Sequence, residues 1–174
     1  MSASPNIVLV GFMGSGKSTA GKNVARLLGR RFIDVDEQIE MREGCSIPEI
    51  FARKGEESFR ELEREIIRFF AAQGGLVIAC GGGAVKDPVN VERLKARGVV
   101  YCLTASPATV LERVGRCNHR PLLAGPDREA RLTALLAERK PLYDQFENQV
   151  STDGREPEAV AEEICRHFTS RAAP

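Results

Sequence analysis

Residues 11–18, with the sequence GFMGSGKS, constrain the fold more than any other part of the chain. They follow the largely apolar stretch 6–10 and precede a stretch whose apolar residues repeat at helical spacing, so we expect a strand, a glycine-rich turn and a helix in succession. In that context GxxxxGK[ST] predicts a loop whose backbone N–H groups surround a phosphate chain at a helix N-terminus. A chance glycine turn is the alternative, and the flanking pattern disfavours it.

Short apolar runs alternate with longer helical patterns along the rest of the chain. Further strands are expected at residues 32–35, 76–79, 99–103 and 150–152. Such alternation predicts an α/β fold, a parallel sheet with helices on both faces. Ligands of these sheets bind at the carboxyl ends of the strands, so the residues that carry the chemistry should follow strands.

The composition disfavours several classes of protein. Lys plus Arg is 25 and Asp plus Glu is 24, a balance that argues against broad binding to nucleic acid or membrane surfaces. The five cysteines form no CxxC pair, so neither a disulfide framework nor a zinc site is expected. No apolar run approaches the ~20 residues of a membrane span, and the N-terminus lacks the basic region of a signal peptide. We therefore expect one cytoplasmic, monomeric domain over residues 1–174, with no nucleic-acid or membrane partner.

Two carboxylates, Asp34 and Asp36, lie at the end of the second expected strand. Alternation along a strand would place both on one face and Val35 on the other. Beside a triphosphate, one could orient metal-bound water and the other could take the proton of an acceptor hydroxyl. A helix N-cap at Asp36 is the alternative, because a helical stretch follows it. The phosphate loop in the same chain favours the functional interpretation.

Three glycines, residues 81–83, follow the third expected strand. They are costly there unless some group approaches the backbone closely. A small substrate bound to main-chain N–H groups would explain them, and a flexible turn is the alternative.

Two arginines are candidates for binding an anion. Arg139 lies within the apolar stripe of its expected helix, seven residues after Leu132, and a buried arginine needs an anionic partner. A carboxylate substrate held in a bidentate fork would supply it. Arg60 follows Phe59 and is expected off the apolar stripe, where a solvated position is the simpler interpretation.

Residues 115–127 form an aperiodic segment bounded by glycine and proline, with arginines at 116 and 120. Long loops are uncommon in compact domains and are often active-site lids. We expect a lid here, with a surface insertion as the alternative.

The set of motifs, in this order, resembles the shikimate kinases over nearly the whole chain. The motifs are GFMGSGKST from Gly11, DVD at 34–36, FRELE at 59–63, GGG at 81–83, RPLL at 120–123 and ERKPLY at 138–143. The resemblance implies a three-layer α/β/α fold like that of nucleoside monophosphate kinases, with five parallel strands. It implies transfer of the γ-phosphoryl group of ATP to the 3-hydroxyl of shikimate, a step of chorismate and aromatic amino acid biosynthesis.

The resemblance also implies roles for individual residues. The catalytic residues would be Lys17, Asp36 and Arg120, with Asp36 as the candidate base in an acceptor region at about 35–63. Mg²⁺ would be held by Ser18 and, through water, by Asp34. ATP would be bound by Gly14, Ser15, Gly16, Lys17, Ser18, Thr19, Arg113, Arg120 and Arg155. Shikimate would be bound by Asp36, Arg60, Gly81, Gly82, Gly83 and Arg139.

The chain departs from the family pattern at Cys80, where Thr or Ser is usual. A thiol is a weaker hydrogen-bond donor than a hydroxyl, so we expect an effect on metal affinity more than on the reaction. Two other functions stay open from the sequence: a related kinase acting on gluconate or a nucleotide, and a nucleotide-binding module that has lost catalysis. The intact Lys17, Ser18, Asp34 and Asp36 argue against the second.

Overall fold

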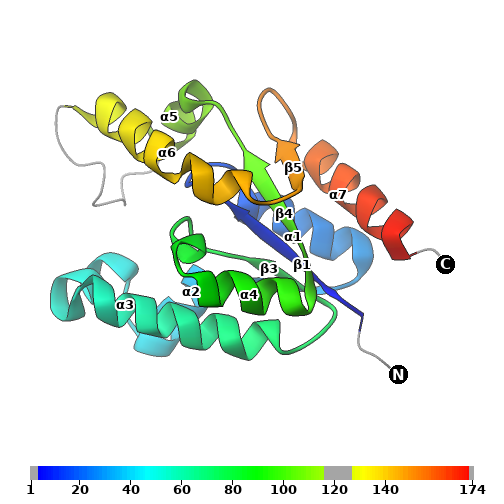
Figure 1. The fold of residues 1–174 in the computed structure, drawn as a ribbon, viewed down its shortest axis with the longest axis horizontal. Coiled ribbons are helices and arrows are strands. Elements are labelled where there is room, and N and C mark those ends of the chain that lie inside the picture. Colours follow the sequence, from blue (N-terminus) through cyan, green and yellow to red (C-terminus); the bar gives the residue numbers. More distant parts are fainter. Residues whose placement is uncertain (1–3, 116–126, 173–174) are drawn as a thin grey trace.

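The computed structural model describes residues 4–115 and 127–172. Its five strands form one parallel sheet in the order β2-β3-β1-β4-β5 (Figure 1). The strands are β1 (Asn6–Gly11), β2 (Arg31–Asp34), β3 (Leu76–Ala79), β4 (Gly98–Thr104) and β5 (Asn148–Ser151). The expected fold class is confirmed. The predicted end of the second strand was one residue too late, because Val35 already belongs to the following helix.

Helices connect the strands and follow the last one. They are α1 (Lys17–Leu28), α2 (Val35–Glu43), α3 (Ile47–Ala71), the short 3₁₀ helix η1 (Ala84–Lys86), α4 (Pro88–Ala96), α5 (Pro107–Gly115), α6 (Arg128–Asp144) and α7 (Pro157–Ala172). Helix α3 is interrupted at Gly55, whose φ of 80° is outside the helical range. None of the helices within the described ranges is both long enough and apolar enough to cross a membrane.

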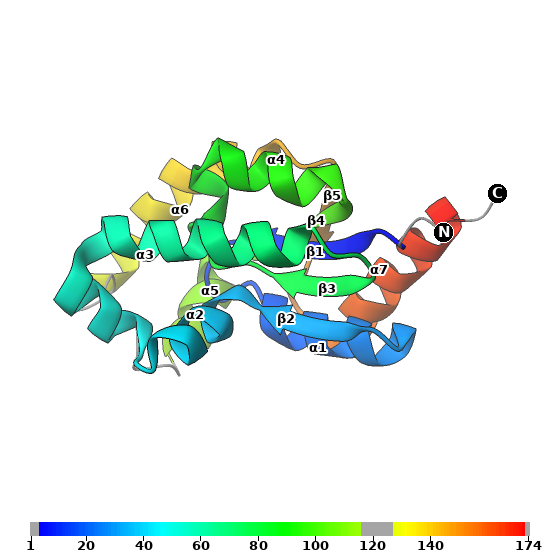
Figure 2. The same ribbon diagram turned by 90° about the horizontal axis from the view of Figure 1, so that it is seen from below.

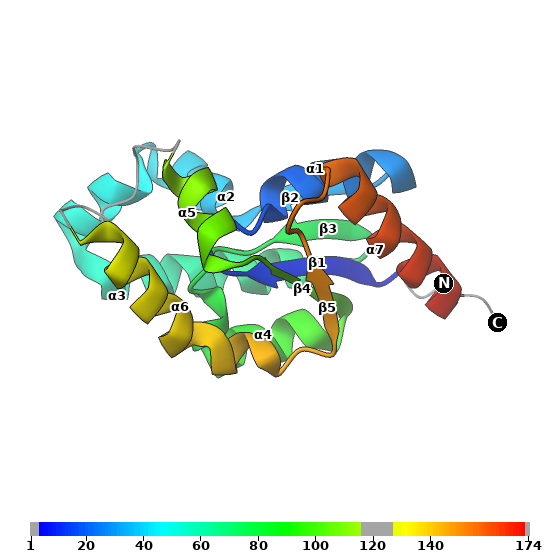
Figure 3. The same cartoon turned by 90° about the horizontal axis from the view of Figure 1, so that it is seen from above.

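Helices bury both faces of the sheet, as Figures 2 and 3 show. In β1, Val8 and Val10 belong to the core shared with α2 to α6, whereas Ile7 and Leu9 belong to the core shared with α1 and α7. This alternation explains why the strands read as continuous apolar runs. The predicted apolar stripes of the helices include two residues that are not buried, because Leu27 and Phe69 are 44% and 63% exposed.

The strand register brings the ends of three neighbouring strands together. Ala79 of β3 pairs with Leu9 of β1 on one side and with Asp34 of β2 on the other. The segments after these residues therefore leave the sheet at the same edge. Figure 3 shows α2, α3, α5 and α6 gathered beyond this edge, with both chain termini at the opposite one.

Candidate active site

The phosphate loop joins β1 to α1 and is shaped by glycine. Gly14 and Gly16 have φ of 74° and 90°, values that side-chain-bearing residues rarely adopt, and Gly16 is the N-cap of α1. The Lys17 ammonium group lies against the loop and donates to the carbonyl oxygens of Gly11 (2.8 Å) and Phe12 (2.9 Å). The loop therefore combines a helix N-terminus with a lysine, the arrangement that binds a phosphate chain.

Both oxygens of the Asp34 carboxylate accept hydrogen bonds. Its Oδ1 accepts from the backbone N–H groups of Asp36 (3.0 Å) and Glu37 (3.3 Å), so Asp34 is the N-cap of α2. Its Oδ2 accepts from the Ser18 hydroxyl at 2.6 Å. A hydroxyl and a carboxylate side by side at the mouth of the phosphate loop suit Mg²⁺, which takes few protein oxygens beside phosphates and water.

This geometry corrects the interpretation of the two aspartates. Asp36 lies in the first turn of α2 and not on a strand, so strand alternation does not explain its direction. The capping residue is Asp34 and not Asp36. Both carboxylates still lie at the carboxyl edge of the sheet, because α2 begins directly where β2 ends.

The three glycines after β3 leave room for side chains from α2 and α3. A Cβ atom at Gly81 would lie 2.6 Å from Oδ1 of Asp36 and 3.2 Å from Oε1 of Glu63, and a Cβ at Gly83 would lie 2.6 Å from Nη2 of Arg60. Real Cβ atoms do not approach as closely as 2.6 Å. The expected close approach to the glycine backbone is thus made by the protein's own acidic and basic side chains.

Arg60 does not lie on a solvated face, which corrects the simpler expectation. Its side chain is only 21% exposed, and its guanidinium pairs with Glu63 (2.8 Å) and Glu56 (3.2 Å). Burial lowers the pKa of Arg60, but the charges of Glu63 and Glu56 outweigh this effect and raise it, so the guanidinium stays charged.

Glu63 is the most deeply buried acid among the described residues that face this site. Its side chain is 1% exposed, and burial raises the pKa of its carboxyl to about 7 against the opposing effect of Arg60. Only Oε2 is hydrogen-bonded to Arg60; Oε1 has no hydrogen-bond partner in the described structure.

Arg139 is buried, as its position in the apolar stripe predicted, with 6% exposure. Its Nη1 lies 3.4 Å from the Gly82 carbonyl oxygen, and its Nε has no hydrogen-bond partner in the ranges that the structure covers. The same carbonyl accepts from the Tyr143 hydroxyl at 2.5 Å. Arg60 and Arg139 therefore approach the glycine segment from two different helices, α3 and α6.

Of the other predicted ATP-site residues, Arg113 and Arg155 are held by contacts with the protein. Arg113 donates to the Gly14 carbonyl (3.1 Å) and to both the hydroxyl and the carbonyl of Thr152 (3.0 and 2.9 Å), which ties α5 to the phosphate loop. Arg155 pairs with Glu163 at 2.7 Å, at the start of α7. Thr19 is exposed in the first turn of α1. Arg120 and most of the predicted lid lie outside the described residues.

Sequence reasoning missed Glu63 and Tyr143. Glu63 lies four residues after Phe59 and three before Ile66, so helical spacing places a carboxylate on the buried stripe, and a buried carboxylate needs a cation. Tyr143 lies four residues after Arg139 and so shares its helix face. Both signals were present in the motifs FRELE and ERKPLY.

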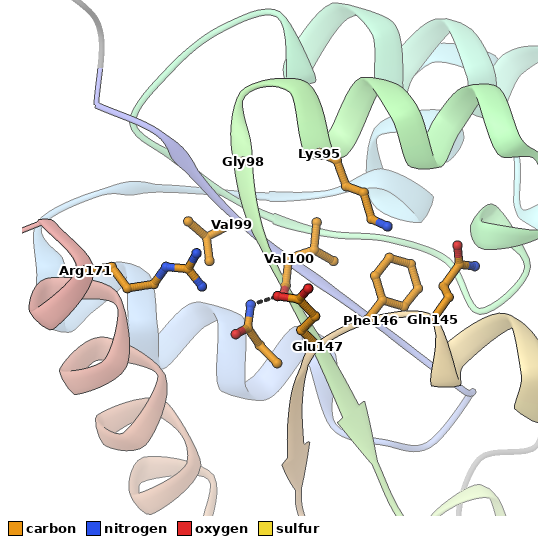
Figure 4. Close-up of a pocket in the computed structure, with 9 residues that line it drawn as sticks. Lys95, Gly98, Val99, Val100, Gln145, Phe146, Glu147 and Arg171 are labelled. Carbon is orange, nitrogen blue, oxygen red and sulfur yellow. Dashed lines mark hydrogen bonds between the residues drawn. The ribbon is translucent and has the colours of Figure 1, made fainter.

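A separate pocket of about 280 Å³ opens where β4 and β5 begin (Figure 4). Its charged lining residues are Lys95, Glu147 and Arg171, and Phe146 lies beside Lys95. None of the predicted site residues lines it. The pocket lies at the amino end of the strands, away from the phosphate loop, so it is not the candidate active site.

The fold and the phosphate loop define the class of protein, a P-loop kinase. Solved structures of other kinases share the fold at low identity, such as a gluconokinase from Sinorhizobium meliloti (TM-score 0.62, 21% identity), and this likeness concerns the fold alone. A sequence model of the shikimate kinase family matches residues 13–169. The chain belongs to the shikimate kinase family.

Individual relatives agree with this assignment. A shikimate kinase from Thermodesulfovibrio yellowstonii is 45% identical over 163 residues, 94% of each chain. One from Moorella thermoacetica is 49% identical over 160 residues, 91% of each chain. The structure of a shikimate kinase from Acinetobacter baumannii in complex with shikimate matches with a TM-score of 0.93 and 38% identity, covering 98% of this chain and 96% of that one.

Proposed function

We propose that this chain transfers the γ-phosphoryl group of Mg-ATP to the 3-hydroxyl of shikimate, with the phosphate loop as the donor site and the segment 81–83 as the acceptor site. The observation that carries the proposal is the approach of two arginines, Arg60 and Arg139, to one glycine segment beside Asp36. A small acceptor that bears a carboxylate would offer both guanidinium groups an anionic partner.

On the donor side, the N–H groups of the loop and the Lys17 ammonium group bind and orient the triphosphate. Ser18 and Asp34 would hold Mg²⁺, Asp34 through water, and the ion would neutralise charge on the phosphate oxygens. Arg113 and Arg155 would flank the adenine. Arg120 would reach the phosphates from the lid, and an arginine in that role contributes about 10³–10⁵ in rate in related enzymes.

On the acceptor side, Arg60 and Arg139 fix the carboxylate and the glycine backbone binds ring hydroxyls. Asp36 lies at the same segment, close to Gly81, and accepts the proton of the hydroxyl that attacks. Because phosphoryl transfer depends mainly on positioning and on neutralising charge, these groups supply most of what the reaction needs.

The first experiment measures ADP release from Mg-ATP with shikimate, gluconate or a nucleoside monophosphate as acceptor, with and without a chelator of Mg²⁺. We expect strong stimulation by shikimate alone, abolished by the chelator. Stimulation by gluconate or by a nucleotide instead would redirect the proposal to a related kinase. ATP binding without stimulation by any acceptor would favour a binding module. A monomeric state and a cytoplasmic location also remain predictions, which sedimentation and cell fractionation would check.

A further inference from the structure

The contact between Tyr143 and the glycine segment is not accounted for by any role above. Tyr143 lies in the last turn of α6 and is 7% exposed. Its hydroxyl donates to the carbonyl oxygen of Gly82 at 2.5 Å. Burial raises the pKa of Tyr143 to about 12, so the hydroxyl keeps its proton and remains a donor at neutral pH.

Gly82 lies between the two halves of the site. A Cβ atom at Gly82 would lie 3.3 Å from the backbone nitrogen of Met13 in the phosphate loop, while the Gly82 carbonyl faces α6. The peptide group between Gly82 and Gly83 is planar, so fixing its carbonyl toward α6 directs its N–H to the opposite side. Within residues 4–115 and 127–172, the N–H groups of Gly82 and Gly83 donate to no backbone carbonyl.

The same carbonyl is a potential partner of Arg139. Arg139 Nη1 reaches it at 3.4 Å, a long contact, whereas the Tyr143 hydroxyl lies at 2.5 Å. If the hydroxyl were absent, Arg139 would be the other donor within 3.5 Å of this partly buried carbonyl, and an acceptor shielded from water without a partner is costly. The guanidinium would then turn toward Gly82 and away from an acceptor's carboxylate.

We propose that Tyr143 is a positioning residue for the acceptor: as the closer donor to the Gly82 carbonyl, it sets the direction of the Gly83 N–H and lets the Arg139 guanidinium turn to a carboxylate. This inference rests on the proposed function, since it assumes that the acceptor binds between Arg139 and the glycine segment. The Tyr143 hydroxyl makes the shorter of the two contacts by which α6 reaches the Gly82 carbonyl.

Tyr143→Phe tests the inference, because it removes the hydroxyl and keeps the ring, which packs edge-on against Phe12 at 6.5 Å. We expect the KM and the calorimetric Kd for shikimate to rise about tenfold, the value of one lost hydrogen bond to a buried group. The KM for ATP and kcat should each stay within about twofold.

Tyr101→Phe is the matched control. Tyr101 is also buried, and its hydroxyl lies 2.9 Å from Nδ1 of His167, in the core shared with α7 on the other face of the sheet. Loss of the Tyr101 hydroxyl should lower the free energy of unfolding about as much as loss of the Tyr143 hydroxyl does, without changing shikimate binding. In the Arg139→Ala background, Tyr143→Phe should raise the shikimate Kd much less than it does alone. The reason is that, in this proposal, Tyr143 acts on the acceptor partly through Arg139.

An unchanged shikimate Kd in Tyr143→Phe would overturn the inference, as would an equal rise in Tyr101→Phe or in the KM for ATP. These outcomes differ from failure of the proposed function. If wild-type protein does not phosphorylate shikimate, the acceptor assignment itself is wrong; if it does and Tyr143→Phe behaves like wild type, only the role of Tyr143 is lost.

Discussion

The proposed donor and acceptor sites lie side by side but are built in opposite ways. The core of the donor site is one continuous stretch, residues 11–18, which offers backbone groups and a single lysine to a phosphate chain. The acceptor site is assembled from α2, α3, α6 and the loop after β3, and its groups are charged side chains held against bare glycine backbone. A local motif can therefore reveal the first site, whereas the second exists only after folding.

This difference predicts that substitutions in the donor site mainly lower kcat, whereas substitutions in the acceptor site mainly weaken the binding of shikimate. The largest effect should come from Lys17→Ala. We expect kcat to fall by about 10³-fold or more, because the ammonium group stabilises charge on the transferring group, while the Kd for shikimate changes little. Steady-state kinetics and calorimetry measure the two quantities.

The control for that prediction is Lys22→Ala, further along α1. The Lys22 side chain is 60% exposed and its ion pair with Glu37 spans 3.4 Å, so its removal should leave both quantities near wild type. If Lys17→Ala weakened shikimate binding as strongly as it slowed the reaction, the two sites would not be separable in this way.

The second largest effect should come from Arg139→Ala on the acceptor side. We expect the Kd for shikimate to rise about 100-fold, since a charge-assisted pair with a carboxylate is lost, while the Kd for ATP stays within about twofold. Lys140→Ala is the neighbouring control, because the Lys140 side chain is 66% exposed and its ion pair is with Asp144 on the same helix. Equal losses for ATP and shikimate would contradict the assignment of Arg139 to the acceptor.

The same contrast explains how much could be predicted from sequence. The strands, the phosphate loop and the burial of Arg139 follow from local patterns, and the structure agrees with them. The expectation that Arg60 is solvated was wrong, because Arg60 forms an ion pair with the buried Glu63. Such a pairing cannot be predicted from the spacing of apolar residues alone. Asp36 was misplaced because the boundary between β2 and α2 depends on Asp34 acting as a cap.

Glu63 shows that the acceptor site is also held at a cost to stability. Burial raises its pKa from 4.5 to about 7, so the folded protein binds a proton more tightly than the unfolded chain. Its contribution to folding is thus fully present below pH 4.5 and is lost as the pH rises through about 7. We expect Glu63→Gln to lack this pH dependence, so that its stability relative to wild type rises between pH 5 and pH 8 by on the order of 2–3 kcal/mol.

Urea unfolding at several pH values measures this effect, and shikimate calorimetry on the same variant adds a second result. Because a glutamine side chain at this position cannot pair with Arg60 as a carboxylate does, we expect shikimate binding to weaken several-fold. Glu61→Gln is the control, since Glu61 is an exposed neighbour on α3 and its variant should follow the wild-type pH profile. Parallel profiles for Glu63→Gln and wild type would rule out this account of Glu63.

The smallest expected effect concerns Cys80, which lies between β3 and the glycine segment, at the boundary of the two sites. Its thiol is 2% exposed, and burial raises the pKa of Cys80 well above its usual value, so it stays a neutral, weak donor. We expect Cys80→Ser to lower the Mg²⁺ concentration for half-maximal activity about threefold, because a hydroxyl bonds better to the water around a cation.

Cys102→Ser introduces the same change at another buried thiol, on β4, and should leave the Mg²⁺ dependence unaltered. A shift of equal size in both variants would point to a general effect of burying a hydroxyl, and no shift in Cys80→Ser would mean that this position does not communicate with the donor site.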